Sequence, residues 1–215
     1  MVKQERAERT RKLLIQAAAA EFARHGYAGT SLTRISRAAT ATVGALTFHF
    51  PAKSELAAAV GAVGAGITRM EVARANRAAR TPLQAVVDIT HALAQLLCED
   101  DTVRATARLS RERDDGRHEW CDAWMPVVRE RLEEAAREEW LRSGSDPEVV
   151  AVLVGHLVAG LEASATGCGD PIRDGRWSLR EQLAEVWELI SLGIAVPTPP
   201  EPAGSSPSHP EPKTT

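Results

Sequence analysis

The chain has 215 residues, of which 44% are hydrophobic and 26% are charged, and its formal net charge is −3 at pH 7. This composition is typical of a soluble globular protein that can bury a real core. No apolar run reaches the roughly 18 residues of a membrane helix. The charged start, MVKQERAERTRK, also lacks the apolar centre of a signal peptide. We therefore expect a cytoplasmic protein with no membrane contact.

The sequence gives little support for a metal site or a disulfide framework. The three cysteines (Cys98, Cys121, Cys168) are odd in number and widely spaced, which argues against a disulfide framework. His118 and Cys121 can share one helix face, but two candidate ligands do not make a zinc site. We expect no metal and no cofactor.

The charge is distributed unevenly along the chain. Residues 1–53 contain nine Lys or Arg against three Glu, a net charge of +6, which leaves −9 for residues 54–215. A basic first quarter indicates a localised contact with a polyanion, above all nucleic acid. A solvated basic helix face is the alternative that charge alone leaves open.

Almost the whole chain is predicted to be helical, because alternating β-branched patterns are absent and Ala, Leu, Glu and Arg dominate. Gly26 is expected to end the first helix, and Ser31 and Thr42 to cap the next two. The predicted helices cover about 5–24, 31–39, 42–48, a long stretch from 54, 82–98, 102–113, 118–142, 146–166 and 178–195.

Three parts are predicted along the chain. Every Phe and Tyr lies in residues 1–53 and every Trp follows residue 119, which indicates two separate cores. We predict a helix-turn-helix domain at 1–53, a larger helical domain at 54–196 and a disordered Pro-rich tail at 197–215. The glycine-rich segment 61–66 (GAVGAG) follows no strand, so close helix packing or a locally weakened helix explains it better than a dinucleotide loop.

The short helices at 31–39 and 42–48 form a helix-turn-helix in the basic segment. Leu46 and Phe50 are expected to point inward, onto Phe22 and Ile35. The opposite face is small and exposed, as a helix needs if it is to enter a major groove. A catalytic role for His49 is rejected because no partner nucleophile or carboxylate lies near it in sequence. The predicted DNA-facing residues are Ser31, Arg34, Thr42, Val43, Gly44, Ala45, Thr47, His49 and Lys53, of which Thr42, His49 and Lys53 are candidate phosphate contacts.

Residues 6–56 resemble the DNA-binding domain of TetR-type transcriptional repressors. The resemblance rests on RTRKLLIQAAAAEFARHGYAGTSLTRIS and GALTFHFPAKSEL. The ending GALTFHFPAKSELAAAV is most similar to the γ-butyrolactone receptors, a TetR subfamily that controls antibiotic production and development in bacteria. Weaker similarity continues in HALAQLLCEDDTVRATARLS and EWCDAW.

Four positions depart from the family pattern. Thr40 stands where a turn glycine is usual, and Val43 and Thr47 stand where the recognition helix usually has lysine and tyrosine. Arg34 stands where an acid often completes the capping box. Loss of a lysine removes a phosphate or base contact. We expect the fold to survive, whereas the operator sequence need not be the family's.

The resemblance implies that the larger domain binds a ligand and forms a dimer. The last predicted helix repeats apolar residues at three- and four-residue spacing (Leu179, Leu183, Val186, Ile190, Ile194), and the helix before it is apolar almost all round. Two such helices can pair with their symmetry mates in a four-helix interface of a homodimer. The alternative is that both are core helices of a monomer.

By resemblance, Trp124 falls where the γ-butyrolactone receptors place a tryptophan over the ligand ring. A buried tryptophan offers a large apolar face and one donor, although it can equally fill a core. Pro126 is expected to kink or start a helix beside it, and the preceding charged loop lacks the family's apolar character. The candidate ligand-binding residues are Trp120, Trp124, Val86, Ile89, Leu93, Leu97, Leu109 and Val127.

The predicted function is therefore that of a homodimeric repressor, cytoplasmic and nucleoid-associated, that binds double-stranded DNA at palindromic operators. A small apolar ligand such as a γ-butyrolactone would release it. Two alternatives remain open: a pseudo-receptor that answers to an antibiotic or precursor, and a helical ligand-binding protein that has lost DNA binding. No nucleophile–base pair, metal cluster or phosphate loop supports an enzyme.

Overall fold

The structure is a computed structural model and describes residues 2–113, 118–165 and 178–196. Within these residues the chain is helical, apart from loops and one isolated antiparallel bridge between Leu141 and Ala195. The helices are α1 (Val2–His25), α2 (Leu32–Ala38), α3 (Val43–His49), α4 (Lys53–Ala78), α5 (Pro82–Glu99), α6 (Asp101–Glu112), α7 (Glu119–Asp122), α8 (Met125–Arg137), α9 (Pro147–Ala165) and α10 (Leu179–Ile194). The predicted all-α fold is confirmed for this part of the chain, and the predicted tail at 197–215 lies outside it.

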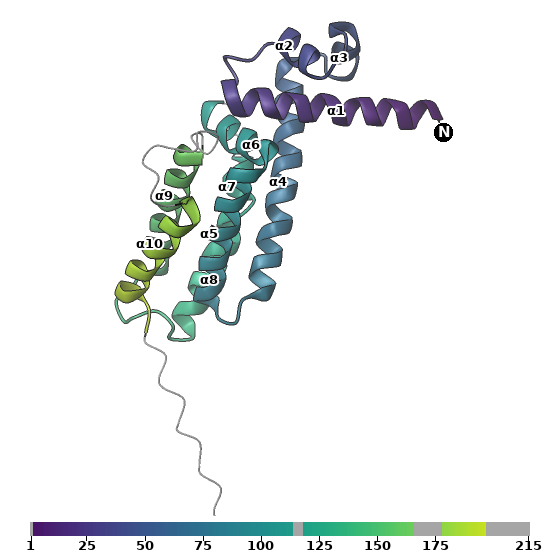
Figure 1. Cartoon of the computed structure of the whole chain (residues 1–215). Coiled ribbons are helices and arrows are strands. Elements are labelled where there is room, and N and C mark those ends of the chain that lie inside the picture. The colour runs from purple at the N-terminus through teal and green to yellow at the C-terminus, as the bar shows by residue number, and fades with distance from the viewer. Residues whose placement is uncertain (1, 114–117, 166–177, 197–215) are drawn as a thin grey trace, which may run out of the picture.

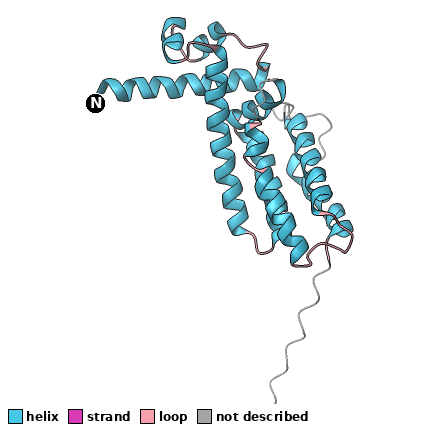
Figure 2. Ribbon diagram, turned by 180° about the vertical axis from the view of Figure 1, so that it is seen from behind, coloured by secondary structure: helices cyan, strands magenta, loops and turns pink. Residues whose placement is uncertain are grey.

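The long helix α4 runs down the molecule and connects its two ends (Figure 1). At its start, α1 lies across it, and α2 and α3 sit above α1. The helices α5, α6 and α7 lie beside α4, α8 packs against α5, and α9 and α10 form the far side (Figure 2). The helix-turn-helix therefore projects from one end of a larger helical body.

Local sequence signals determine how the first three helices begin and end. Gly26 adopts φ +70° directly after α1, which is the predicted left-handed cap. The hydroxyl oxygens of Ser31 and Thr42 accept the backbone N–H groups of Arg34 and Ala45, at 3.2 and 3.1 Å. Both predicted N-caps are thus confirmed.

The turn between α2 and α3 contains a strained residue. Thr40, which replaces the usual glycine, adopts φ +52° in the left-handed region. That region costs a non-glycine residue roughly 1–2 kcal/mol. The following N–H, of Ala41, donates to the carbonyl of Ser36 at 2.9 Å and closes the turn. The turn is therefore closed with a threonine in a conformation that favours glycine.

Two hydrophobic cores are present, as predicted. In the first, Phe22, Ile35, Leu46 and Phe50 are all buried. This core does not end at residue 53, because it also contains Leu56, Ala57 and Val60 of α4 and Ala105 and Leu109 of α6. The second core begins with Val72 of α4 and includes most buried residues of α5 and of α7 to α10. The helix α4 thus contributes to both cores.

The glycine-rich segment lies where α4 and α6 pack most closely. A Cβ atom on Gly64 would meet the Thr106 hydroxyl and lie 2.8 Å from the carbonyl oxygen of Thr102. The Thr106 hydroxyl donates to the Thr102 carbonyl at 2.8 Å and lies 3.3 Å from the carbonyl of Val60. The prediction of close helix packing is confirmed at Gly64, whereas the Cβ position of Gly66 is open.

The predicted single helix at 118–142 is wrong. The structure has the short helix α7 and a separate helix α8 that ends at Arg137. Pro126 occupies the first turn of α8, where a missing N–H is tolerated, so the chain restarts a helix there. Glu139 then adopts φ +61° and the helix does not continue. Trp124 stands at the break between α7 and α8.

Two helices, α4 and α9, have the length and apolar composition of a membrane span, contrary to the expectation from apolar runs. Both pack within the protein: α4 against α1, α5 and α6, and α9 against α5 and α8. Buried core helices pass the same test of length and composition, so this observation gives α4 and α9 no membrane role.

Candidate nucleic-acid interface and ligand site

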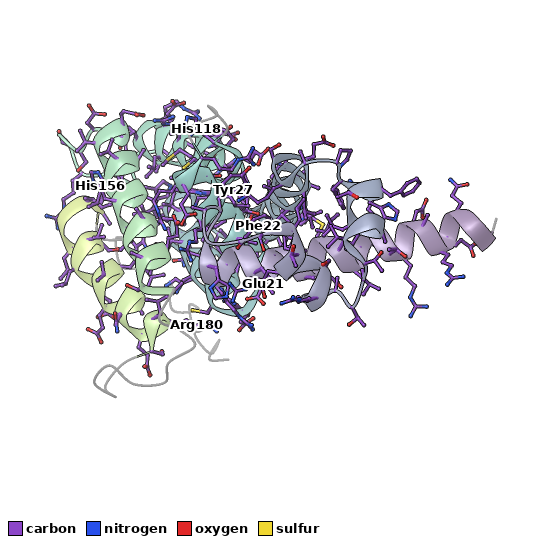
Figure 3. The ribbon with its side chains drawn as sticks, turned by 90° about the horizontal axis from the view of Figure 1, so that it is seen from above. Glu21, Phe22, Tyr27, His118, His156 and Arg180 are labelled. Atoms are coloured by element: carbon purple, nitrogen blue, oxygen red, sulfur yellow. The ribbon has the colours of Figure 1, made fainter. Side chains whose placement is uncertain are left out.

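The helix-turn-helix presents most of the predicted DNA-facing residues at its surface. Ser31, Arg34, Thr42, Val43 and Gly44 are exposed, and Ala45, Thr47, His49 and Lys53 are half-buried. Seen from above, α1 extends past the helix-turn-helix, while Glu21, Phe22 and Tyr27 lie where α1 meets the larger body (Figure 3). The structure thus brings the nine residues to one end of the molecule.

Lys53 has a structural contact that the sequence did not indicate. Its ammonium group donates to the carbonyls of Tyr27 and Thr30, at 2.9 and 3.0 Å, and lies 4.2 Å from the centre of the Tyr27 ring. These bonds fasten the loop between α1 and α2 to the start of α4. An ammonium group has three donors, so one remains for a phosphate. The phosphate contact of Lys53 stays a prediction.

Arg34 and its neighbours form a polar surface between α1 and α2. The Arg34 guanidinium lies 2.9 Å from the Glu21 carboxylate, so Arg34 joins α2 to α1 in place of a capping-box acid. A hollow of about 480 Å³ opens here, lined also by Ser31, Thr33 and Arg37. Arg37 is exposed and makes no ion pair within the described residues, so it is a candidate phosphate contact that sequence reasoning missed.

The outward face of α3 is apolar. Val43 is 42% exposed and Phe48 is 81% exposed, with its ring edge-to-face against His49 at 5.3 Å between centroids. The Thr47 hydroxyl donates to the carbonyl of Gly44 at 3.2 Å. Sequence reasoning missed Phe48, although the signal was present. Leu46 and Phe50 were predicted to point inward, and a helical residue midway between them must point outward.

The last turns of α6 bind the end of α1. The Arg108 guanidinium donates to the carbonyls of Ala23 and Arg24, at 3.0 and 3.1 Å. These carbonyls lie in the last turn of α1, where a cation is favourable. The Glu112 carboxylate accepts the Tyr27 N–H at 2.6 Å and pairs with Arg108 at 2.6 Å.

These bonds affect the ionisation of Glu112. Burial on its own raises the pKa of Glu112, but hydrogen bonds from Arg108 and the Tyr27 N–H, with the charges of Arg108 and Arg111, outweigh it and lower the pKa. The contact between α6 and α1 therefore favours the charged form of Glu112.

The same end of α6 also contacts α9. Arg111 pairs with Glu162, a carboxylate whose residue is only 9% exposed. Burial raises the pKa of Glu162, and the charge of Arg111 partly offsets this rise. One short stretch of α6, from residue 108 to 112, thus connects the helix-turn-helix end of the chain to α9.

Most of the predicted ligand-binding residues lie in the second core. Val86, Ile89, Leu93 and Leu97 line up along the buried side of α5, Trp120 and Trp124 belong to the same cluster, and Val127 packs against it half-buried. Leu109 does not belong here: it lies in the first core, because that side of α6 faces α1. We remove Leu109 from the candidate site.

Trp124 is 2% exposed, and its indole N–H has no hydrogen-bond partner within the described residues. Trp187 and Trp140 differ: their N–H groups donate to Thr90 at 2.7 Å and to Glu138 at 3.2 Å. A buried donor without a partner costs about 1–3 kcal/mol. An acceptor placed beside the Trp124 N–H would remove that penalty.

A cavity of about 670 Å³ lies between α5 and α10, away from the predicted pocket. Burial and the charge of Arg180 lower the pKa of His91 at its edge, while Asp88 acts in the opposite direction. None of the predicted ligand-binding residues lines this cavity. Its lining consists of Gln84, Val87, His91, Arg142, Ala184, Trp187, Glu188, Ser191, Leu192 and Ala195.

The outer sides of α9 and α10 are apolar and exposed. The large exposed residues here are Val149, Val152, Leu153, Val186, Leu189, Leu192 and Val196. Of the apolar repeat predicted in the last helix, Leu183 is buried and Leu179, Ile190 and Ile194 pack on the chain's own core. Gly155 faces Met125 of α8, whereas Ala159 and Gly160 are exposed. A second stripe on α10, at 186, 189 and 192, therefore faces outward.

Comparison with known proteins agrees with this geometry. Residues 14–60 match the family described as "Bacterial regulatory proteins, tetR family". The A-factor receptor protein of Streptomyces griseus is 32% identical over 199 residues, which is 92% of this chain and 68% of the relative.

Solved structures show the same likeness over the whole fold. A γ-butyrolactone receptor (ArpA-like protein) superposes with a TM-score of 0.70 and 28% identity, covering 89% of this chain and 90% of the other. CprB from Streptomyces coelicolor, in complex with its biological operator sequence, gives a TM-score of 0.71 and 30% identity, covering 88% and 90%.

The regulators of this family bind DNA operators and small-molecule ligands, are generally dimers, and are soluble cytoplasmic proteins rather than enzymes. Of these properties, the exposed helix-turn-helix of this chain corresponds to the binding of DNA operators. This chain belongs to the TetR family of DNA-binding transcriptional regulators and is related within it to the γ-butyrolactone receptors.

Proposed function

We propose that this protein is a homodimeric, nucleoid-associated repressor that binds palindromic operators and is released by a small apolar signal such as a γ-butyrolactone. The observation that carries the ligand assignment is the buried indole N–H of Trp124 without a partner. One of its relatives of known structure is named a γ-butyrolactone receptor, and the A-factor receptor protein is named for a signal that it receives.

The DNA-binding half of the proposal rests on charge and shape. The first 53 residues carry a net charge of +6, and α3 projects with its outward face uncovered. Binding should fall steeply as salt rises, because each phosphate contact releases counterions. Two copies of α3 in one dimer would read successive major grooves, roughly 34 Å apart.

The dimer in this proposal forms through α9 and α10. Their outward apolar side chains would otherwise stay in water, and a second copy related by a two-fold axis can cover the same patch on both chains.

The ligand in this proposal lies against Trp124 and the buried side of α5. The indole N–H would donate to a carbonyl or ring oxygen, and Val86, Ile89 and Leu93 would contact an alkyl tail. A signal at α5 has a direct route to the DNA-binding end, because α5 packs on both α4 and α6. A shift of α6 would move α1 through Arg108 and Glu112 and change the spacing of the two α3 helices.

Selection against a random duplex-DNA pool at near-physiological salt tests the DNA-binding half. Enrichment of an inverted repeat is the expected result. Failure of folded protein to enrich any motif would favour the alternative of a helical ligand-binding protein that has lost DNA reading.

The ligand half is tested by titrating γ-butyrolactones of different tail length into the protein–operator complex and following DNA release by fluorescence anisotropy. Release by an antibiotic or precursor, with no response to any butyrolactone, would favour the pseudo-receptor alternative. The charged loop that favours this alternative includes residues 114–117, which lie outside the described residues.

The substitution Trp124→Phe keeps the ring in the core but removes the N–H. Removal of the donor without a partner offsets part of the cost of the smaller ring, so the free protein should stay folded, whereas ligand affinity should fall about tenfold. Trp140→Phe is the matched control, because the Trp140 N–H already donates to Glu138. Equal ligand affinity in wild type and Trp124→Phe would contradict the proposed site.

A further inference from the structure

The side chains that α3 offers to a DNA groove are almost entirely apolar. From residue 43 to 48 the sequence is VGALTF, without a guanidinium, ammonium, amide or carboxylate. The exposed members are Val43, Gly44 and Phe48, and Phe48 is the most exposed large hydrophobic residue of the described chain. A Cβ on Gly44 would meet nothing closer than the Thr42 hydroxyl, at 4.0 Å, so the groove-facing surface is open there.

The Thr47 hydroxyl is engaged within the helix, whereas the Thr42 hydroxyl accepts the cap bond and keeps its O–H donor for a phosphate. Thr47 uses its one donor on the carbonyl of Gly44, and the Thr42 oxygen accepts the Ala45 N–H. Thr47 can therefore offer its methyl group to a base without breaking a bond. Direct reading of bases by hydrogen bonds from α3, the usual means of specificity in the major groove, has few groups available here.

The surroundings of this apolar face nevertheless favour DNA as the occupant. The face belongs to the segment with a net charge of +6, and the exposed Arg34 and Arg37 lie on the neighbouring helix α2. A polyanion is attracted to this end of the molecule, so the apolar side chains would be held against base edges.

In the major groove, the C5-methyl group of thymine is the apolar feature that a side chain such as Phe can contact. We propose that Val43, Phe48 and the methyl group of Thr47 read thymine methyl groups, and that this contact replaces hydrogen bonds as the main source of base specificity. The inference rests on the proposed DNA-binding function and names the chemistry that the reading helix recognises.

The size of the effect follows from the burial of one methyl group. Burial of a single carbon of this kind changes affinity by about fourfold, and a dimer that contacts two symmetry-related thymines should show about fifteenfold.

The experiment uses the full-length protein and the duplex enriched by selection. Each thymine is replaced in turn by deoxyuridine, which keeps base pairing and removes only the methyl group. Anisotropy titrations at fixed salt should show a rise in Kd of about fourfold at specific, two-fold-related positions and no change elsewhere. Placing 5-methylcytosine in a non-operator duplex, at the corresponding positions, should raise affinity over plain cytosine.

Variants connect the effect to α3. Phe48→Ala and Val43→Ala should weaken binding to the duplex that contains thymine. Each variant should then bind the deoxyuridine duplex as tightly as it binds the thymine duplex. Leu13→Ala, an exposed apolar residue on α1, is the matched control and should keep the full response. Circular dichroism checks that each variant is folded.

The outcomes separate the two proposals. Tight binding of an inverted repeat that is indifferent to every deoxyuridine would overturn methyl reading and leave the repressor function standing. Absence of binding to any duplex would overturn both.

Discussion

Exposed apolar side chains gather on two surfaces of the described chain, one on α3 and one on the outer sides of α9 and α10, and the two surfaces differ mainly in the charges around them. Phe48 and Val43 lie in a basic segment, beside Arg34 and Arg37. On α10, the exposed Leu189 and Leu192 share a helix with three exposed glutamates (Glu181, Glu185, Glu188).

This difference indicates which partner each surface takes. A polyanion is attracted to the first surface and repelled from the second. An uncharged or self-complementary partner, such as a second copy of the chain, fits the second surface better. Exposure of hydrophobic side chains alone would not distinguish an interface with nucleic acid from an interface with protein. The charges of the neighbouring side chains make that distinction.

The largest effect is expected from breaking the second surface. Leu189 is 71% exposed in the single chain, so Leu189→Asp should leave the protomer folded but place a charge without a partner in the proposed dimer interface, at a cost of about 3–5 kcal/mol. Analytical ultracentrifugation should show a monomer, and operator affinity should fall more than about a hundredfold. Met70→Asp is the control, because the Met70 side chain is an exposed part of α4, and this variant should remain dimeric. A Leu189→Asp protein that stays dimeric would place the interface elsewhere.

The next effect concerns the helix pair that connects the two regions. Gly64→Ala should destabilise the protein by about 1–3 kcal/mol, because the new Cβ would collide with Thr106 and the Thr102 backbone. Gly66→Ala is the matched control: nothing lies within 4 Å of its Cβ position, so it should gain roughly 0.5–1 kcal/mol of helix propensity. Urea unfolding of both variants measures the difference, and equal stabilities would show that α4 and α6 are not packed as described.

A smaller effect is expected at the contact between α6 and α1. The pKa of Glu112 is lowered in the folded chain, so its charge stabilises the fold above the unfolded pKa, near 4.5, and this contribution is lost as the pH falls through the folded pKa. Glu112→Gln should lower stability by about 0.5–1.5 kcal/mol at pH 7 and by less at pH 4. Urea titrations at both values test this, with the exposed Glu138→Gln as reference. A loss that is the same at both pH values would mean that the charge of Glu112 is not what matters.

The smallest effect concerns His91 beside the cavity between α5 and α10. Burial and Arg180 lower its pKa, so the unfolded chain binds a proton more readily than the folded one. Stability should therefore decrease as the pH falls below about 6.5. His91→Gln should show a smaller fall in melting temperature between pH 7 and 5.5 than wild type. If the melting temperature of His91→Gln falls as much as that of wild type, titratable groups other than His91 cause the effect.

Features set by neighbouring residues could be predicted from the sequence. The caps at Gly26, Ser31 and Thr42 depend on a few adjacent residues, and the inward set of the first core follows from helical spacing. Both predictions are confirmed because each concerns a segment short enough for one pattern to determine it.

Features set by distant contacts could not be predicted. Leu109 has the spacing of a core residue, but nothing in α6 itself shows which of two cores it enters. The unpaired N–H of Trp124 depends on what surrounds it in space, while the contact of Lys53 with the Tyr27 carbonyl spans 26 residues. The break between α7 and α8 is signalled in the sequence only by Pro126, a residue that can kink a helix as well as start one.

The bonds from α6 to α1 have a consequence for building hybrid regulators. Arg108 and Glu112 hold carbonyl oxygens of Ala23 and Arg24 and the N–H of Tyr27, all of which are main-chain groups. A chain with the same fold supplies these groups whatever its side chains, unless proline stands at the position of Tyr27. A DNA-reading segment from a relative could therefore be grafted onto this sensor, provided the joint in α4 lies after Val60 and keeps Gly61 and Gly64. Such a graft would place new operators under the control of the same signal.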